Sequence, residues 1–143
     1  MKILKILTTK RIIGNIGEKA ALRFLKRRRY KILARNYVGD GHEIDIIAKK
    51  DDVIAFVEVK TRTSGHMNPK EPRPASSVTK DKQQSIISCA KVFLSTYREK
   101  CKKRFDIIEV YLFDSGKKKT VLEIKHLENT FNLNTAHSYS KGY

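Results

Sequence analysis

Two short runs of the chain, residues 42–48 and 53–60, carry charged side chains that could bind a metal ion or a phosphate group. The first run contains Asp45, and the second contains Glu58 and Lys60. Both runs are rich in β-branched residues, and the polar Lys-Lys-Asp-Asp between them predicts a turn, so together they form a β-hairpin. Paired carboxylates can hold a divalent cation, or an adjacent lysine can neutralise them.

The register of this hairpin follows from a turn centred between residues 51 and 52. Asp45 then lies opposite Glu58, and Glu43 lies opposite Lys60 on the same face. Facing carboxylates about 5 Å apart repel, and burial increases the cost because desolvation penalises an ionised carboxylate. The balancing cation is Lys60, a divalent metal, or both. A plain network of cross-strand salt bridges is the alternative.

The composition favours a polyanionic partner. Thirty-one Lys and Arg residues against fifteen Asp and Glu residues give a net charge of +16. Nucleic acid is the first expectation and an anionic membrane surface the second, although a ribosomal or histone-like protein would carry a similar charge. Six of the fifteen acids fall within residues 40–58. An acidic patch inside a basic protein suits metal binding with phosphate held around it, whereas phosphate binding alone would not require it.

The cysteines and the hydropathy limit the class of protein. Cys89 and Cys101 are too few and too far apart for a disulfide framework or a zinc site. No stretch approaches the roughly 20 apolar residues of a membrane span. We therefore expect a cytoplasmic protein that does not enter a membrane.

The length of 143 residues fits one domain. Residues 1–13 are expected to be a basic N-terminal arm, and residues 14–131 a single domain. Within it, residues 61–78 contain all three prolines and show no periodicity, which predicts a flexible loop in which Arg62 could meet phosphate. Residues 132–143 are polar and are expected to be disordered.

A helix is predicted from Gly17 to about Arg29. Glu18 lies on its apolar stripe, because Leu22 and Leu25 follow it by four and seven residues. Glu18 is also the only acid among residues 1–35. One explanation is an acid favoured by the helix dipole in the first turn. The other places Glu18 beside the acids of the hairpin, as a ligand of a metal or of a water molecule.

A second helix is predicted from residue 79 to about 100. Lys82 and Gln83 lie in its first turns, where backbone amides already favour an anion. They are phosphate-binding candidates, with ordinary exposed helix formers as the alternative. Strands are predicted at 30–37, 105–113 and 121–127. Together these elements predict an α/β domain with a mixed central sheet, two flanking helices and the acidic site at one edge of the sheet.

Six blocks of the sequence, in this order, resemble the YraN family of bacterial proteins. This family is related in fold to archaeal Holliday-junction resolvases and to the PD-(D/E)XK nuclease superfamily. The blocks are Gly17-Glu18, Glu43-Ile-Asp-Ile-Ile-Ala48, Phe56-Val-Glu-Val-Lys-Thr-Arg62, Lys82-Gln83, Arg104-Phe-Asp106 and Asn129-Thr-Phe131.

The resemblance implies a restriction-endonuclease-like core and a catalytic set of Glu18, Asp45, Glu58 and Lys60. In such a site Asp45 and Glu58, with the carbonyl of Val59, would hold Mg²⁺ or Mn²⁺, hard cations that take oxygen ligands. Lys60 would orient the attacking water or stabilise developing charge. Glu18 would position the water or a second ion.

The leading hypothesis is therefore a metal-dependent endonuclease that hydrolyses phosphodiester bonds in branched or otherwise structured DNA. Arg62, Lys82 and Gln83 would hold the nucleic-acid backbone. Because resolvase-like relatives act as dimers, the resemblance also allows a homodimer. The alternative is a nucleic-acid-binding protein that has the scaffold of a nuclease but no catalytic activity of its own.

Overall fold

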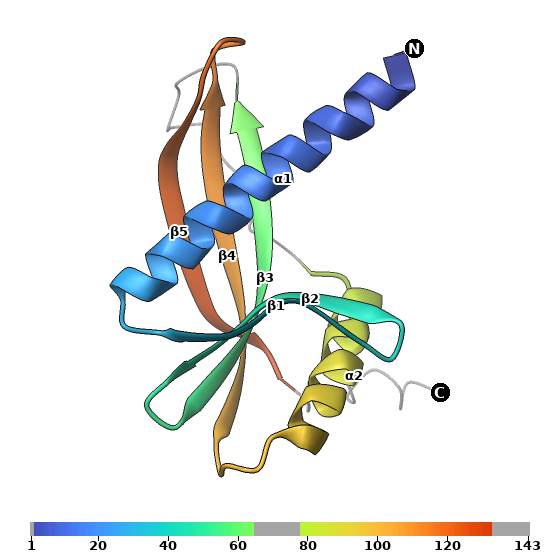
Figure 1. Ribbon diagram of the computed structural model, residues 1–143, viewed down its shortest axis with the longest axis vertical. Coiled ribbons are helices and arrows are strands. Elements are labelled where there is room, and N and C mark those ends of the chain that lie inside the picture. The colour runs from blue at the N-terminus through green and yellow to red at the C-terminus, as the bar shows by residue number, and fades with distance from the viewer. Residues whose placement is uncertain (1, 65–77, 133–143) are drawn as a thin grey trace.

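The computed structural model describes residues 2–64 and 78–132, which form two helices and five strands (Figure 1). In chain order these are α1 (Lys2–Arg27), β1 (Lys31–Gly39), β2 (His42–Lys50), β3 (Val53–Ser64), α2 (Lys80–Thr96), β4 (Lys102–Asp114) and β5 (Lys119–Phe131). The five strands form one sheet in the order β1-β2-β3-β4-β5. The expected α/β fold with a mixed, helix-flanked sheet is confirmed, and it is consistent with a restriction-endonuclease-like core.

The sheet is antiparallel except between β3 and β4, which are parallel. Parallel neighbours need a long crossover, and α2 lies in the segment that joins these two strands. Figure 1 shows α1 running diagonally across β3, β4 and β5, whereas α2 lies beside the β1–β2 hairpin. The sheet is thus covered by one helix on each face.

Each helix buries its own apolar cluster against the sheet. On the α1 side, Leu25 packs with Ile46 and Val57 of the hairpin strands. On the α2 side, Ile86 packs with Phe56 and Phe105. Successive side chains along β2 and β3 point to opposite faces of the sheet, and both faces are buried by a helix. This explains why both strands are rich in β-branched and aromatic residues.

Strand β2 leaves β3 halfway along its length. The two strands pair from Lys50–Val53 to Ile46–Val57, and no further pair follows within the described residues. Beyond that point β2 stays with β1, and Asn36 in β1 adopts a left-handed φ of 47° between two regular pairs of the ladder. Residues 58–64 of β3 therefore pair only with β4.

The turns follow the sequence closely. Asp51 has a φ of 55° in the two-residue turn between β2 and β3, centred where the sequence predicts it. Asp40 and Gly41 have φ values of 54° and 73°, a conformation that favours Gly, Asn and Asp and suits a two-residue hairpin.

Helix α1 begins earlier than predicted. Residues 2–13, expected to form an arm outside the domain's first helix, are its first turns. No proline interrupts them, and their Lys, Leu and Ile residues tolerate a helix. No helix in the described part of the chain is long and apolar enough to cross a membrane.

The predicted loop at residues 61–78 is also shorter than expected at its start, because β3 continues to Ser64 and so includes Arg62. The rest of that loop prediction, at 65–77, lies outside the described residues, as does the predicted disorder of 133–143. Helix α2 ends at Thr96 rather than near residue 100, because Tyr97 is extended, with φ −93° and ψ 117°.

Candidate functional site

The site is built where β2 separates from β3. The carboxylate of Asp45 accepts a hydrogen bond from the backbone N–H of Val59, at 2.8 Å between Oδ2 and N. A buried backbone N–H left without a partner is costly. Asp45 therefore replaces the lost strand pairing, and this contact fixes its carboxylate at the edge of β3.

Asp45 and Glu58 face each other as the register predicts. The ladder that ends at Ile46–Val57 brings these acids together one residue further on, and their carboxyl groups are hydrogen-bonded. Glu58 is only 8% exposed. Burial, and then the charge of Asp45, raise the pKa of Glu58 to about 7. Burial also raises the pKa of Asp45, despite the hydrogen bond from Val59. The pair therefore favours a shared proton or a bound cation near neutral pH.

Two lysines approach this pair from different elements. Lys60 on β3 places its Nζ 3.6 Å from Oε1 of Glu58, and Lys82 on α2 places its Nζ 3.8 Å from the same oxygen. Lys82 lies in the first turn of α2, where its backbone N–H donates a hydrogen bond to the side chain of Thr79. The sequence suggested Lys82 as a phosphate ligand but gave no sign that it reaches Glu58.

Glu18 reaches the site from α1. Its pKa is raised by burial first and then by the negative charges of Asp45 and Glu43, whereas Arg35 and a hydrogen bond with Asn36 lower it. Three of the four predicted catalytic residues, Asp45, Glu58 and Lys60, thus lie on β2 and β3. The fourth, Glu18, lies next to them on α1.

Gly17 allows this approach. A Cβ atom at Gly17 would lie 1.9 Å from Oγ1 of Thr61 on β3, so α1 can rest on the strand only where this side chain is absent. Glu18 follows directly in the sequence. The tight contact therefore sets the position from which Glu18 faces Asp45.

One predicted pairing is wrong. Glu43 does not lie opposite Lys60, because β2 has already separated from β3; its partner is Val38 in β1. The strand beside Lys60 is β4, where Glu109 is its partner. Glu109 is buried and hydrogen-bonded to the hydroxyl of Tyr111. Nothing in the sequence marks Glu109 as a site residue, because it lies within a run typical of an ordinary strand.

The other two predicted phosphate ligands lie at the margin of the site. Arg62 is exposed on β3, two residues beyond Lys60 and therefore on the same face. Gln83 donates its side-chain amide to the carbonyl of Val78 at 3.0 Å, so it serves the start of α2 rather than the acids.

A second buried acid, Asp106 on β4, is fully paired. Arg104 donates to its carboxylate from Nε and Nη2, both at 2.9 Å, and the Asn129 backbone N–H donates at 3.0 Å. His126 on β5 approaches the same carboxylate at 2.7 Å. Burial opposes ionisation of Asp106, but the hydrogen bonds from His126 and Arg104 outweigh it and lower the pKa. This cluster joins β4 to β5 and has a structural role.

The donor set at Asp45 and Glu58 suits a hard divalent cation. Mg²⁺ commonly binds through one or two carboxylates and completes its shell with water and substrate phosphate. The carbonyl of Val59 follows Glu58 on the edge of β3 that β2 has left. Within residues 2–64 and 78–132 no group of three or more His, Cys, Asp and Glu side chains is placed to hold a metal ion. A site made of these two carboxylates would therefore depend on substrate oxygens.

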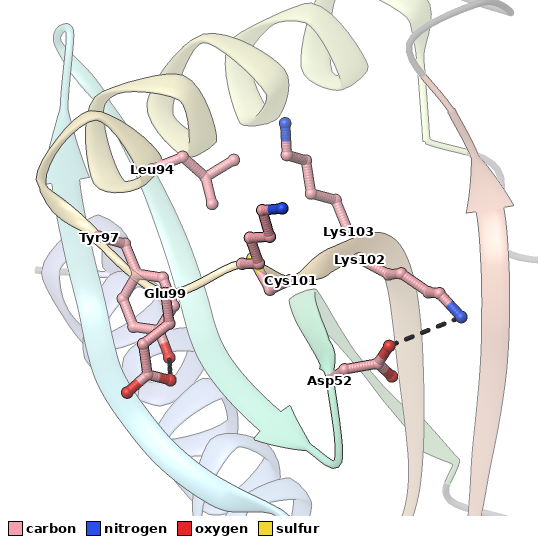
Figure 2. Close-up of a pocket in the computed structure, with 8 residues that line it drawn as sticks. Asp52, Leu94, Tyr97, Glu99, Cys101, Lys102 and Lys103 are labelled. Atoms are coloured by element: carbon pink, nitrogen blue, oxygen red, sulfur yellow. Dashed lines mark hydrogen bonds and ion pairs between the residues drawn. The ribbon is translucent and has the colours of Figure 1, made fainter.

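A separate cavity of about 480 Å³ lies near the end of α2 (Figure 2). Its two acids are paired with basic or hydroxyl groups: Asp52 lies 3.6 Å from Lys102 Nζ, and Glu99 accepts from the Tyr97 hydroxyl at 2.9 Å. None of the predicted site residues lines this cavity. It therefore adds nothing to the acidic site.

Comparison with known proteins assigns the family. Residues 17–110 match the model of "Uncharacterised protein family UPF0102". A relative from Geobacter metallireducens is 43% identical over 123 residues, covering 85% of this chain and 93% of its own. Relatives from Caldanaerobacter subterraneus (41% over 123 residues) and Clostridium perfringens (42% over 124 residues) each match 85% of this chain, and 96% and 94% of their own lengths. All three are named only UPF0102 protein. The chain belongs to the UPF0102 family.

Proposed function

We propose that Asp45 and Glu58 form the centre of a metal-dependent endonuclease of the PD-(D/E)XK type. The observation that carries the proposal is the buried, hydrogen-bonded carboxyl pair with Lys60 and Lys82 beside it. Such a pair is costly unless a cation or a proton balances it. Catalytic sites commonly contain acids whose pKa values are displaced in this way.

In this proposal each residue has a distinct task. Asp45 and Glu58, with the Val59 carbonyl, would hold Mg²⁺ or Mn²⁺. The ion, when bound, would polarise the scissile phosphate and lower the pKa of the attacking water. Lys60 would orient that water or stabilise the charge that develops on the phosphate, and Glu18 would position the water from the side of α1.

The net charge of +16 supports nucleic acid as the substrate, because a strongly basic protein attracts a phosphate backbone. Structured or branched DNA is the substrate that we propose first. Arg62 and Lys82 would hold phosphates beside the cleaved bond, since both lie on the side of the sheet that carries Glu58 and Lys60.

One observation favours the alternative of a non-catalytic nucleic-acid-binding protein. Lys60 and Lys82 already lie 3.6 and 3.8 Å from Glu58, so the acids have cationic partners without a metal ion. Under this alternative the site is a salt-bridged part of a binding surface. DNA would bind with a steep salt dependence, metal ions would not change the affinity, and no DNA structure would be cleaved.

The deciding experiment is a cleavage assay with labelled four-way junctions, flapped duplexes and single strands, in Mg²⁺ or Mn²⁺. The variants are Asp45→Asn, which keeps an oxygen for the Val59 hydrogen bond, and Glu58→Gln. We expect both to lose metal-dependent cleavage and to retain most of the DNA affinity. Glu99→Gln changes an exposed acid in the other cavity and is the matched control. Equal cleavage by the wild type and both site variants would overturn the proposal, and binding without cleavage would favour the alternative.

A further inference from the structure

Two glycines of α1 differ in what surrounds them. At Gly17 an added Cβ would collide with Thr61, so the packing of α1 on β3 explains that glycine. At Gly14 an added Cβ would meet no atom within 4 Å. Glycine weakens the interior of a helix relative to alanine, and Gly14 lies in the middle of a 26-residue helix. Nothing in the described part of the chain approaches Gly14 closely enough to require it.

Gly14 lies on the side of α1 that carries Glu18. Residues four and seven positions apart share one face of a helix, so Gly14 and Arg11 fall in line with Glu18, and Asn15 lies beside them. Seven residues span about 10 Å of helix, so Arg11 lies about that distance along the axis from Glu18. In Figure 1 the N-terminal end of α1 projects past β3, the strand that carries Glu58.

The side chains along this line suit a phosphate backbone. Arg11 and Asn15 are both exposed. A guanidinium can donate two parallel hydrogen bonds to a phosphate, and an amide can donate one. Glu18 is the only acid in the first 35 residues, so no other acid of α1 offsets the charge of Arg11.

The opposite side of the helix has a different character. Arg23 lines a hollow of about 220 Å³ with the apolar side chains of Phe24 on α1 and of Val121 and Ile124 on β5. That hollow lies on the β5 side of α1, away from Asp45 on β2. The two sides of α1 therefore provide a matched comparison between arginines on the same helix.

We propose that Arg11, Gly14 and Asn15 bind the sugar-phosphate backbone of a nucleic-acid strand next to the acidic site. This inference rests on the proposed function, because it takes Asp45, Glu58 and Glu18 as the place where the strand is cleaved. Arg11 contacts a phosphate beyond the scissile one, Asn15 adds a hydrogen bond, and Gly14 lets the strand approach the helix between Arg11 and Glu18.

The test is DNA binding by fluorescence anisotropy with a labelled four-way junction, in EDTA and over a series of salt concentrations. Arg11→Gln is expected to weaken binding about 5- to 10-fold and to reduce the slope of log K against log salt by about one. Gly14→Ala is expected to raise the melting temperature, because alanine favours the helix. It is nevertheless expected to weaken DNA binding at least about threefold, because the added methyl group keeps the DNA strand further from the helix. Arg23→Gln, which removes the same charge from the other side of α1, is expected to change the affinity less than twofold.

The inference would be overturned if Arg11→Gln and Gly14→Ala bound the junction as tightly as Arg23→Gln and the wild type do. So would a defect of Arg11→Gln confined to binding of anionic phosphatidylserine vesicles, which would indicate that this side of α1 meets a lipid surface. Because binding is measured without metal, its outcome is separate from that of the cleavage assay. If the wild type cleaves DNA but Arg11→Gln and Gly14→Ala bind it normally, only this inference fails. If both variants bind more weakly but the wild type cleaves no DNA, only the proposed nuclease activity fails.

Discussion

The carboxylate of Asp45 takes the place of a strand partner for Val59: its Oδ2 lies 2.8 Å from the backbone nitrogen that donates to it. This contact occurs where β2 turns away from β3. It explains how an acid can be held rigidly at a sheet edge while its second oxygen remains able to face Glu58. The separation of β2 from β3 and the acidic site are therefore one structural feature.

Substituting Glu58 should make stability less dependent on pH. The pKa of Glu58 is raised from an ordinary value near 4.5 to about 7, so between these values the folded protein holds a proton that the unfolded chain has lost. The stabilising contribution of Glu58 is thus complete below about pH 4.5 and is lost as the pH rises through about 7. Glu58→Gln should exceed the wild type in stability at pH 8 by on the order of 1–3 kcal/mol and should show no such gain at pH 4.

Urea denaturation of the wild type and Glu58→Gln at several pH values measures this difference. The exposed acid in Glu99→Gln serves as a control, because its change should not grow between pH 4.5 and 7. A constant difference between Glu58→Gln and the wild type at all pH values would contradict the raised pKa.

Two glycine substitutions on α1 should act in opposite directions. Gly17→Ala forces a Cβ atom against Thr61 and should destabilise the fold by about 1–3 kcal/mol, as overpacking does. Gly14→Ala adds a Cβ in open space and should stabilise it by about 0.5–1 kcal/mol. Thermal unfolding of both variants measures the contrast. Changes of the same sign in both would show that α1 does not rest on β3 at Gly17.

The Asp106 cluster should matter for folding and not for chemistry. Asp106→Ala leaves Arg104 without its closest carboxylate and should cost about 3–5 kcal/mol. Glu128 is the other acid near Arg104, but it is 56% exposed and 3.6 Å away, so Glu128→Ala should change stability by less than about 1 kcal/mol. Chemical denaturation compares the two, and equal losses would show that the burial of Asp106 carries no special weight.

Divalent-ion binding should strengthen as the pH rises through about 7. A carboxylate must lose its proton before it can bind a metal ion, and the pKa of Glu58 lies near that value. The Mn²⁺ affinity of the wild type should therefore increase between pH 6 and pH 8. Mn²⁺ titrations at both pH values measure it, and an affinity independent of pH would place the ion elsewhere.

Much of the scaffold could be predicted from the sequence, because it depends on local patterns. The alternation in β2 and β3 and the polar turn at Asp51 determine the register that brings Asp45 to Glu58. The cluster of polar residues from Thr79 onward marks the start of α2 within one residue. These features involve neighbours in the chain, where residue type constrains the backbone directly.

The rest depends on contacts between distant segments. A hairpin register that extends without interruption pairs Glu43 with Lys60, but the β2–β3 ladder ends at the Ile46–Val57 pair. The reach of Lys82 to Glu58 and the convergence of Arg104 and His126 on Asp106 require tertiary placement that no spacing in the chain reveals. Amphipathic periodicity likewise predicts α1 only from Gly17 onward, so the first turns of the helix lie outside that prediction.

The most direct test of the central claim is a calorimetric Mn²⁺ titration at pH 8 of the wild type, Asp45→Asn, Glu58→Gln and Glu99→Gln. Each is titrated alone and saturated with a four-way junction protected by phosphorothioate linkages, so that substrate oxygens can complete the site. We predict a Mn²⁺ site in the DNA-bound wild type and Glu99→Gln that is lost in Asp45→Asn and Glu58→Gln. If all four proteins gave the same Mn²⁺ binding curve, both alone and bound to DNA, the result would contradict a metal centre at Asp45 and Glu58.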